Sequence, residues 1–173
     1  MLSRFAPSKD QLTLCRSVKI LKQELKIDIN LILCGNYHTR EGLEVINYIT
    51  ENNLTDIIIL VGEITNINDF FININIYIGS SINETFGLSL LEAMSRKFPV
   101  LASDIPAHTE LLDNGKYGML FKLYDEIDLV EKIKLMIHNN NIQKYSKLAF
   151  ERSLKFDIKN TVSEFEKLYL SLI

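Results

Sequence analysis

The stretch IYIGSSINETFGLSLLEAM at residues 76–94 decides the fold of this chain. It joins an apolar run that ends at a glycine to a polar loop and then to a helical pattern. Unalternating apolar runs are typical of strands that are buried on both faces of a sheet. In open α/β folds, the loops that follow such strands bind ligands at the carboxyl edge of the sheet. The stretch therefore predicts a strand, a ligand-binding loop and a helix.

The same alternation continues on both sides of this stretch. Further strands are predicted at 29–34, 57–62, 99–103 and 117–121. Helices are predicted at about 9–26, 39–52 and 106–113, from 125 onward, and at 141–152 and 158–172. Strands separated by helices in this way indicate a parallel sheet built from βαβ units, so the predicted fold class is α/β.

Two helix starts are predicted from capping patterns. Ser8 followed by Gln11 has the spacing of a capping box, which predicts that the first helix begins near Lys9. In the central stretch, Thr85 is placed to cap a helix that begins at Phe86.

Length and composition limit the class of protein. A chain of 173 residues, 47% of them hydrophobic, is long enough for one well-buried domain and too short for two, so a single domain over 1–173 is expected. The formal net charge of −3 argues against a nucleic-acid partner. There is no apolar run of membrane-span length and no signal-peptide core, so we expect a cytoplasmic protein without a transmembrane segment.

The two cysteines, Cys15 and Cys34, lie in apolar surroundings without the spacing of a zinc site or a CxxC motif. We therefore expect buried, reduced thiols.

The loop and helix of the central stretch carry two carboxylates, Glu84 and Glu92. A helix N-terminus offers unpaired N–H groups to a phosphate, and a glycine such as Gly87 lets a ligand approach the backbone closely. Glu92, almost two turns into the helix, would accept hydrogen bonds from paired hydroxyls such as those of a ribose, and Glu84 would reach another hydroxylated group. Both carboxylates also fit solvated surface positions, and spacing alone leaves both interpretations open.

Five segments in fixed order carry a family resemblance: SRFAPSKDQ, LILCGNY, IIILVGEI, SSINETFGLSLLEAMSRKFPVLASDIPAHTELL and YGMLF. Within the fourth, Glu84 and Glu92 have the spacing E-x7-E. Together the segments resemble the C-terminal, donor-binding half of the family 4 (group 1) glycosyltransferases of the GT-B fold. The resemblance spans nearly the whole chain and implies a Rossmann-like three-layer domain.

The segment 67–79 is interpreted partly from this resemblance. Its alternation of Ile and Asn alone predicts one long strand. With the resemblance, we expect a short helix through Phe70 and Phe71, followed by a strand at about 75–79.

The resemblance also implies how a nucleotide sugar would be held at its diphosphate. Arg4 and Lys9 would neutralise the diphosphate, and the backbone amides of Phe86, Gly87 and Leu88 would bind its distal phosphate.

The remaining donor contacts follow in the same way. Glu84, the residue assigned to the reacting centre, would contact the transferred sugar, and Glu92 would hold the nucleotide ribose. The loop at Gly62, Glu63 and Ile64 would border the base.

The implied reaction is retaining sugar transfer, with the departing phosphate helping to remove the acceptor proton. No D-x-D triplet is present, so we expect a metal-independent reaction without a cofactor. For His108, in PAHTELL, we expect a role in loop packing and not contact with substrate.

Part of the family pattern is missing from this sequence. Its acceptor domain does not precede the chain, and only Met1 and Leu2 remain of the first strand of the donor half, so a fragment or split gene is expected. An N-terminal acceptor domain is the implied partner, and 157–173 resembles the helix that crosses back to it. The acceptor would be a glycan or lipid-linked sugar, in bacterial surface-polysaccharide or lipopolysaccharide assembly at the inner face of the membrane.

Two alternatives stay open. One is a fragment of a GT-B-like sugar-nucleotide epimerase, although the ETFGLSLLEAM spacing favours a transferase. The other is a non-catalytic subunit that binds nucleotide sugars and pairs with a separate acceptor domain.

Overall fold

The computed structural model describes residues 1–24 and 29–172 and confirms the α/β class. Its strands are β1 (Leu31–Cys34), β2 (Ile58–Val61), β3 (Tyr77–Gly79), β4 (Val100–Ser103) and β5 (Met119–Phe121). Its helices are α1 (Gln11–Glu24), α2 (Arg40–Glu51), α3 (Ile67–Phe71), α4 (Leu88–Ser95), α5 (Pro106–Leu111), α6 (Glu126–Ile137), α7 (Asn141–Ser153) and α8 (Ile158–Leu170), with a 3-10 turn, η1, at Leu154–Phe156. The helix and strand expected within 67–79 are α3 and β3. The predicted end of the first helix, near Lys26, lies outside the described residues.

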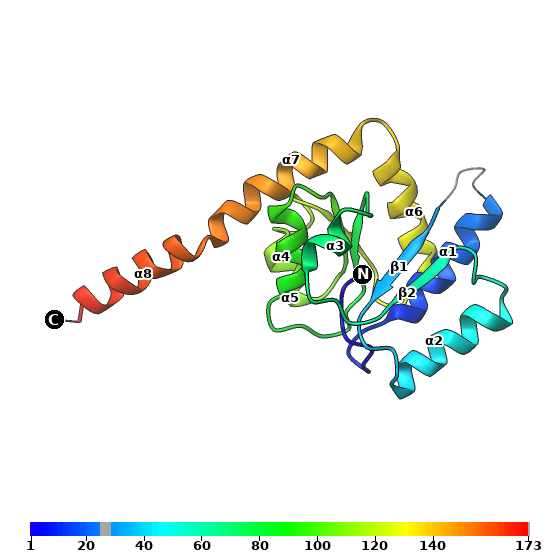
Figure 1. The fold of residues 1–173 in the computed structure, drawn as a ribbon. Helices are drawn as coiled ribbons and strands as arrows, with labels where there is room; N and C mark the ends of the chain where they lie inside the picture. Colours follow the sequence, from blue (N-terminus) through cyan, green and yellow to red (C-terminus); the bar gives the residue numbers. More distant parts are fainter. Residues whose placement is uncertain (25–28, 173) are drawn as a thin grey trace.

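All strand pairs are parallel, in the orders β1-β2 and β3-β4-β5. The extended N-terminal residues lie between these two groups. Leu2 forms a parallel bridge with Cys34 of β1, and the Tyr77 hydroxyl of β3 donates to the Leu2 carbonyl at 3.4 Å. The N-terminus is accordingly at the centre of the molecule in Figure 1.

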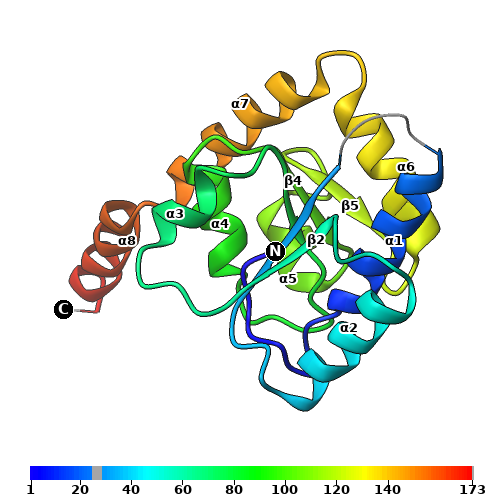
Figure 2. The same cartoon turned by 45° about the vertical axis from the view of Figure 1, so that its right-hand side comes forward.

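Helices pack on both faces of the parallel strands. The side chains of β4 point alternately into the cores on the two faces. Leu101 packs into a core with α1, α2 and α6, whereas its neighbours Val100 and Ala102 pack into a second core with α3, α4 and α5. Every residue of β4 is buried. The result is the expected three-layer arrangement, which can be followed in Figure 2.

The predicted capping box at the first helix is wrong. Asp10 caps this helix, because its carboxylate accepts from the Thr13 amide at 3.1 Å and from the Thr13 hydroxyl at 2.6 Å. The backbone carbonyl of Ser8 accepts instead from the amide of Ile82 at 2.8 Å. The segment before α1 is therefore held by the loop that follows β3.

The expectation that strand 57–62 is buried on both faces is also wrong. In β2, Ile59 is 44% exposed. Within the described residues β2 pairs only with β1, so it forms an edge of the sheet, where an apolar side chain can face solvent.

The last helix differs from the others. No residue of α8 is buried, and Figure 1 shows it extending away from the body of the protein. Its exposed apolar residues include Val162, Phe165 and Leu168.

Cys15 and Cys34 are free and buried, as expected. Burial raises the pKa of the Cys15 thiol to about 12, so this thiol stays protonated. Among the described residues, no helix combines the length and the apolarity needed to pass through a bilayer.

Candidate functional site

The parallel strands bring several loops to one edge of the sheet. Gly35, Gly62 and Ser80 directly follow β1, β2 and β3, and Asp104 follows β4. Because parallel strands end at the same edge, the segments singled out in the sequence meet there.

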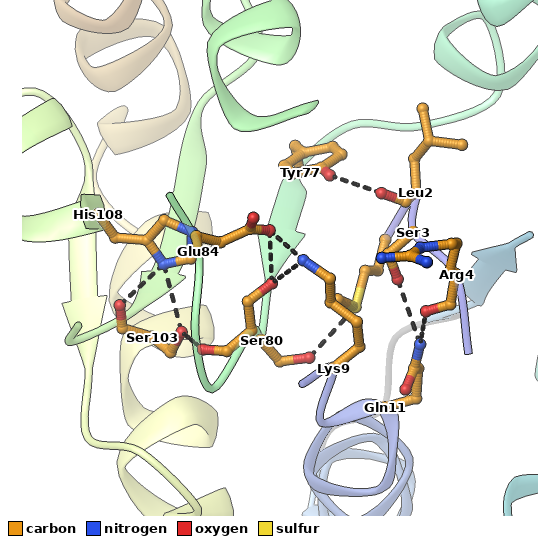
Figure 3. Close-up of polar contacts among 12 residues, drawn as sticks. Leu2, Ser3, Arg4, Lys9, Gln11, Tyr77, Ser80, Glu84, Ser103 and His108 are labelled. Atoms are coloured by element: carbon orange, nitrogen blue, oxygen red, sulfur yellow. Dashed lines mark hydrogen bonds and ion pairs between the residues drawn. The ribbon is translucent and has the colours of Figure 1, made fainter. Parts of the chain in front are cut away.

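Lys9 and Glu84 form the centre of the site. The Lys9 ammonium forms an ion pair with Glu84 Oε1 and donates to Ser81 Oγ at 3.1 Å. The Ser81 hydroxyl in turn donates to the same carboxylate oxygen at 3.0 Å. Figure 3 shows the Lys9 and Glu84 side chains pointing toward one another from different parts of the chain. Their side chains are only 11% and 21% exposed, so the pair is partly shielded from water.

Backbone contacts fix this arrangement. Lys9 and Ser81 form an isolated antiparallel bridge. The Asp10 amide donates to the Ser80 carbonyl at 3.1 Å, and the Ser80 hydroxyl donates to the Asp10 carbonyl at 2.6 Å. Hydrogen bonds therefore hold the Lys9 backbone against the loop that carries Glu84. They keep the two side chains close enough to form the ion pair.

The surroundings of Glu84 favour its charged form. Burial alone would raise the pKa of this carboxyl, but the hydrogen bond and charge of Lys9 and the hydrogen bond from Ser81 outweigh it, so the pKa lies below its usual value. The carboxylate is consequently a hydrogen-bond acceptor at neutral pH.

The start of α4 differs from the prediction. The helix begins at Leu88, and Gly87 is its N-cap, so Thr85 does not cap a helix that starts at Phe86. Gly87 has φ 94°, in the left-handed region that favours glycine. The Leu90 and Leu91 amides both donate to the Gly87 carbonyl, at 3.0 Å, so the amides of Leu88 and Ser89 precede the first bonds within the helix.

The His108 ring packs against the turn at Gly87. The sequence predicted loop packing for His108 and did not assign it to the site. It is 2% exposed, and its Nδ1 lies 3.0 Å from the Ser103 carbonyl oxygen, which requires a proton on Nδ1. A Cβ at Gly87 would come within 3.3 Å of the His108 ring. The Ser103 hydroxyl, 3.3 Å from Nδ1, donates to the Ser81 carbonyl. His108 thus packs under both Gly87 and the Glu84 loop, in agreement with the expected packing role.

The burial of His108 makes stability depend on pH. Burial lowers the pKa of its imidazole, against the hydrogen bond that it donates to the Ser103 carbonyl and the charge of Glu84, which raise it. The folded state therefore prefers neutral His108, and the unfolded state takes up the proton first as the pH falls below about 6.5. The stability contributed by the neutral ring is full above this pH and is lost as the pH falls toward the lower folded pKa.

We expect the free energy of unfolding to fall more steeply between pH 7.5 and pH 5.5 in the wild type than in a His108→Asn variant. Urea unfolding at both pH values measures the difference. Other groups that titrate in this range contribute equally to both proteins, so equal losses in the two would contradict the assignment to His108.

Glu92 lies on α4, near enough to Tyr77 for its charge to act on the Tyr77 hydroxyl. The Tyr77 hydroxyl is buried, which raises its pKa to about 12, and the charges of Glu84 and Glu92 act in the same direction. Both carboxylates of the E-x7-E pair therefore act on one phenol, which lies near both of them. Glu92 is half-buried and not a fully solvated helix position.

The other predicted residues line the edges of this region. Arg4 is exposed, and its carbonyl oxygen accepts from Gln11 Nε2 at 2.9 Å. Figure 3 places Arg4 on the Lys9 side of the site. Phe86 packs edge-on against Phe156, with ring centroids 5.6 Å apart, and Leu88 is 69% exposed.

Two glycines follow β1 and β2, and their surroundings differ: Gly35 is tightly packed, and Gly62 is open. A Cβ at Gly35, where φ is 143°, would lie 2.0 Å from the Ser3 carbonyl oxygen, whereas a Cβ at Gly62 would meet nothing within 4 Å. The Gly62 carbonyl accepts from Cys34 Sγ at 3.3 Å. Ile64 packs against the second core.

Two further features concern possible ligands. An open hollow after β4 is lined by Asp104, Ile105, Pro106, Thr109, Glu110 and Asn114. Within 1–24 and 29–172, no group of His, Cys, Asp and Glu side chains is arranged to hold a metal ion. The expectation of a metal-independent reaction stays a prediction.

Comparison with known families and proteins adds to this geometry. The family described as glycosyl transferases group 1 matches residues 1–150. The capsular polysaccharide biosynthesis glycosyltransferase CapH of Staphylococcus aureus is 26% identical over 170 residues, which are 98% of this chain and 46% of CapH. The chain thus spans about half the length of this relative.

Solved structures share the fold. A glycosyltransferase from Rickettsia africae superposes with a TM-score of 0.87 at 22% identity, over 98% of this chain and 46% of that protein. HepE of Anabaena, in complex with UDP and glucose, superposes with a TM-score of 0.86 at 22% identity, over 99% of this chain and 47% of HepE. These likenesses confirm the GT-B type of architecture.

Proposed function

Because the chain belongs to the group 1 glycosyltransferases, we propose that it is the donor-binding half of a retaining enzyme that transfers a sugar from a nucleotide sugar to a glycan or lipid-linked acceptor. The observation that supports this most directly is the placement of Lys9 and Glu84 together beside the N-terminus of α4. A cation, a helix N-terminus and a carboxylate are the groups that a diphosphate and a sugar require.

The proposed roles follow the edge of the sheet. Lys9 and Arg4 neutralise the diphosphate, and the amides around Gly87, from Phe86 to Leu88, bind its distal phosphate. Glu84 accepts hydrogen bonds from the transferred sugar.

The nucleoside lies on the other side of the diphosphate. Glu92 holds the ribose hydroxyls, and the loop at Gly62 and Ile64 borders the base. The absence of any Cβ contact at Gly62 leaves room for this approach.

The reaction breaks the bond between the sugar C1 and the oxygen of the distal phosphate and forms a bond from C1 to the acceptor oxygen on the same face. Negative charge develops on the leaving phosphate, and preorganised donors such as Lys9 and the helix amides stabilise it. The leaving phosphate takes the acceptor proton. In this scheme Glu84 positions the sugar and does not act as a nucleophile.

We propose that 1–173 form one domain and that an N-terminal acceptor domain completes the enzyme, with 157–173, which includes α8, reaching toward it. UDP is the first nucleotide to test, because HepE binds it. The name of CapH supports a role in surface-polysaccharide assembly. The location at the inner face of the membrane stays a prediction.

Thermal unfolding of the 173-residue chain with UDP, GDP, ADP and their sugars tests the donor site. A ligand at a hundred times its Kd adds roughly 2.7 kcal/mol, which corresponds to a rise of about 5–10 °C in Tm for a domain of this size. We expect such a rise with one nucleotide and its sugars, and no loss of the rise on adding EDTA.

Two results would contradict the proposal. A cooperative transition that no nucleotide moves would show that the folded chain has no donor site. A rise that requires magnesium would contradict the metal-independent reaction.

A further inference from the structure

The ion pair between Lys9 and Glu84 joins two residues that the proposed function assigns to different parts of the donor. Lys9 is assigned to the diphosphate and Glu84 to the sugar. In the structure they bind one another, and Ser81 bonds to both. The ammonium that should receive a phosphate therefore already holds an anion.

We propose that the Glu84 carboxylate competes with the donor diphosphate for Lys9, so that the site selects nucleotide sugars over bare nucleoside diphosphates. This inference rests on the proposed function and adds a specificity-determining role for Glu84 to it. The Glu84 carboxylate binds the Lys9 ammonium where the phosphate would bind. It leaves when a ligand brings both a phosphate for Lys9 and hydrogen-bond donors for the carboxylate.

The two ligands differ in the hydrogen-bond donors that they bring to the released carboxylate. Glu84 is 21% exposed, so a carboxylate that leaves Lys9 is not freely solvated. A bare nucleoside diphosphate takes Lys9 away and adds negative charge nearby, which leaves Glu84 with the Ser81 hydroxyl alone. A nucleotide sugar also brings sugar hydroxyls, which donate to the carboxylate and offset its loss of Lys9.

Backbone contacts limit this exchange of partners to the Lys9 and Glu84 side chains. Lys9 and Ser81 are joined by a backbone bridge, and Ser80 bonds to Asp10, so the two segments stay together while the side chains change partners. Only the Lys9 ammonium and the Glu84 carboxylate need to move.

The test is calorimetric titration of the full chain and its Glu84→Gln variant with UDP and with UDP-glucose. Glutamine keeps the size and hydrogen-bonding capacity of the side chain but cannot form the ion pair. We expect Glu84→Gln to bind UDP about fivefold more tightly than the wild type, the scale of a partly exposed ion pair, and to gain no affinity for UDP-glucose. Glu151→Gln, which removes one exposed carboxylate on α7, is the matched control and should leave both affinities unchanged.

A double-mutant cycle separates competition for Lys9 from simple charge repulsion. In a Lys9→Gln background, Glu84→Gln should no longer tighten UDP binding, because no ammonium remains to be released. If it tightens UDP equally in both backgrounds, Glu84 repels the diphosphate directly and the competition is refuted.

A wild-type measurement covers the case in which these variants do not fold. Carbon NMR of the Glu84 carboxyl follows its pKa, which should rise when UDP at saturation draws Lys9 away. A pKa that stays at its ligand-free value, or a Glu84→Gln variant that binds UDP no better than the wild type, overturns the inference. A wild-type chain that binds no nucleotide at all instead overturns the proposed function.

Discussion

Gly35→Ala is expected to lower the free energy of unfolding by about 3 kcal/mol, the sum of backbone strain at a positive φ and overpacking. The added Cβ would lie 2.0 Å from the Ser3 carbonyl oxygen, a backbone atom that no side-chain rotation can move. The Ser3 amide is itself bonded to the Cys34 carbonyl at 3.0 Å. Relief of the clash therefore requires the N-terminal segment to leave β1. Chemical unfolding in urea measures the loss.

Gly62→Ala is the matched control. Gly62 follows β2 as Gly35 follows β1, and the two strands pair through Cys34 and Val61. A Cβ at Gly62 meets nothing within 4 Å, so its replacement should change stability by no more than about 0.5 kcal/mol. Similar losses in the two variants would mean that the close approach of Ser3 to Gly35 does not limit the fold.

Glu92→Ala is expected to weaken the binding of UDP by about 1.5–3 kcal/mol, or roughly 10- to 100-fold in Kd, because the ribose loses a charged hydrogen-bond acceptor. Glu92 is half-buried on α4, and its charge also acts on the Tyr77 hydroxyl. Calorimetric titration with UDP measures the change.

Glu92→Gln serves as the comparison for this variant, since the amide still accepts a hydrogen bond without the charge. Its Kd should fall between those of the wild type and Glu92→Ala. Wild-type affinity in Glu92→Ala would show that the ribose lies elsewhere and that Glu92 has been assigned wrongly.

Hydrophobic periodicity predicted most of the helices and strands, whereas the two predicted caps, Ser8 and Thr85, were wrong. Thr39 caps α2 by accepting from the Gly42 amide at 3.0 Å, and Asp125 caps α6 by accepting from the Asp128 amide at 2.8 Å. These helix starts follow from neighbouring residues, which a sequence displays directly. Ser8 failed as a cap because its carbonyl is used by Ile82, a residue far along the chain that no local pattern includes.

The candidate site was predicted less completely. The motif identified Glu84 and Glu92, and the resemblance added Lys9, but neither indicated that Lys9 binds Glu84 directly. Thr85 matched the preferences for a cap, yet the chain turns at Gly87 with a positive φ that only the tertiary arrangement requires. For His108 the sequence predicted loop packing, but it did not indicate that the ring packs against Gly87, because that contact exists only in the folded chain.

The bridge between Lys9 and Ser81 also has a consequence for how the protein is made. Lys9 leaves the ribosome well before Ser81 and Glu84, the residues that its side chain contacts in the folded protein. Closing a loop of this length carries an entropic cost that local helix formation does not, and contacts between distant residues slow folding. The ion pair between Lys9 and Glu84 can therefore form only after the loop that follows β3 has been synthesised and has reached the segment before α1.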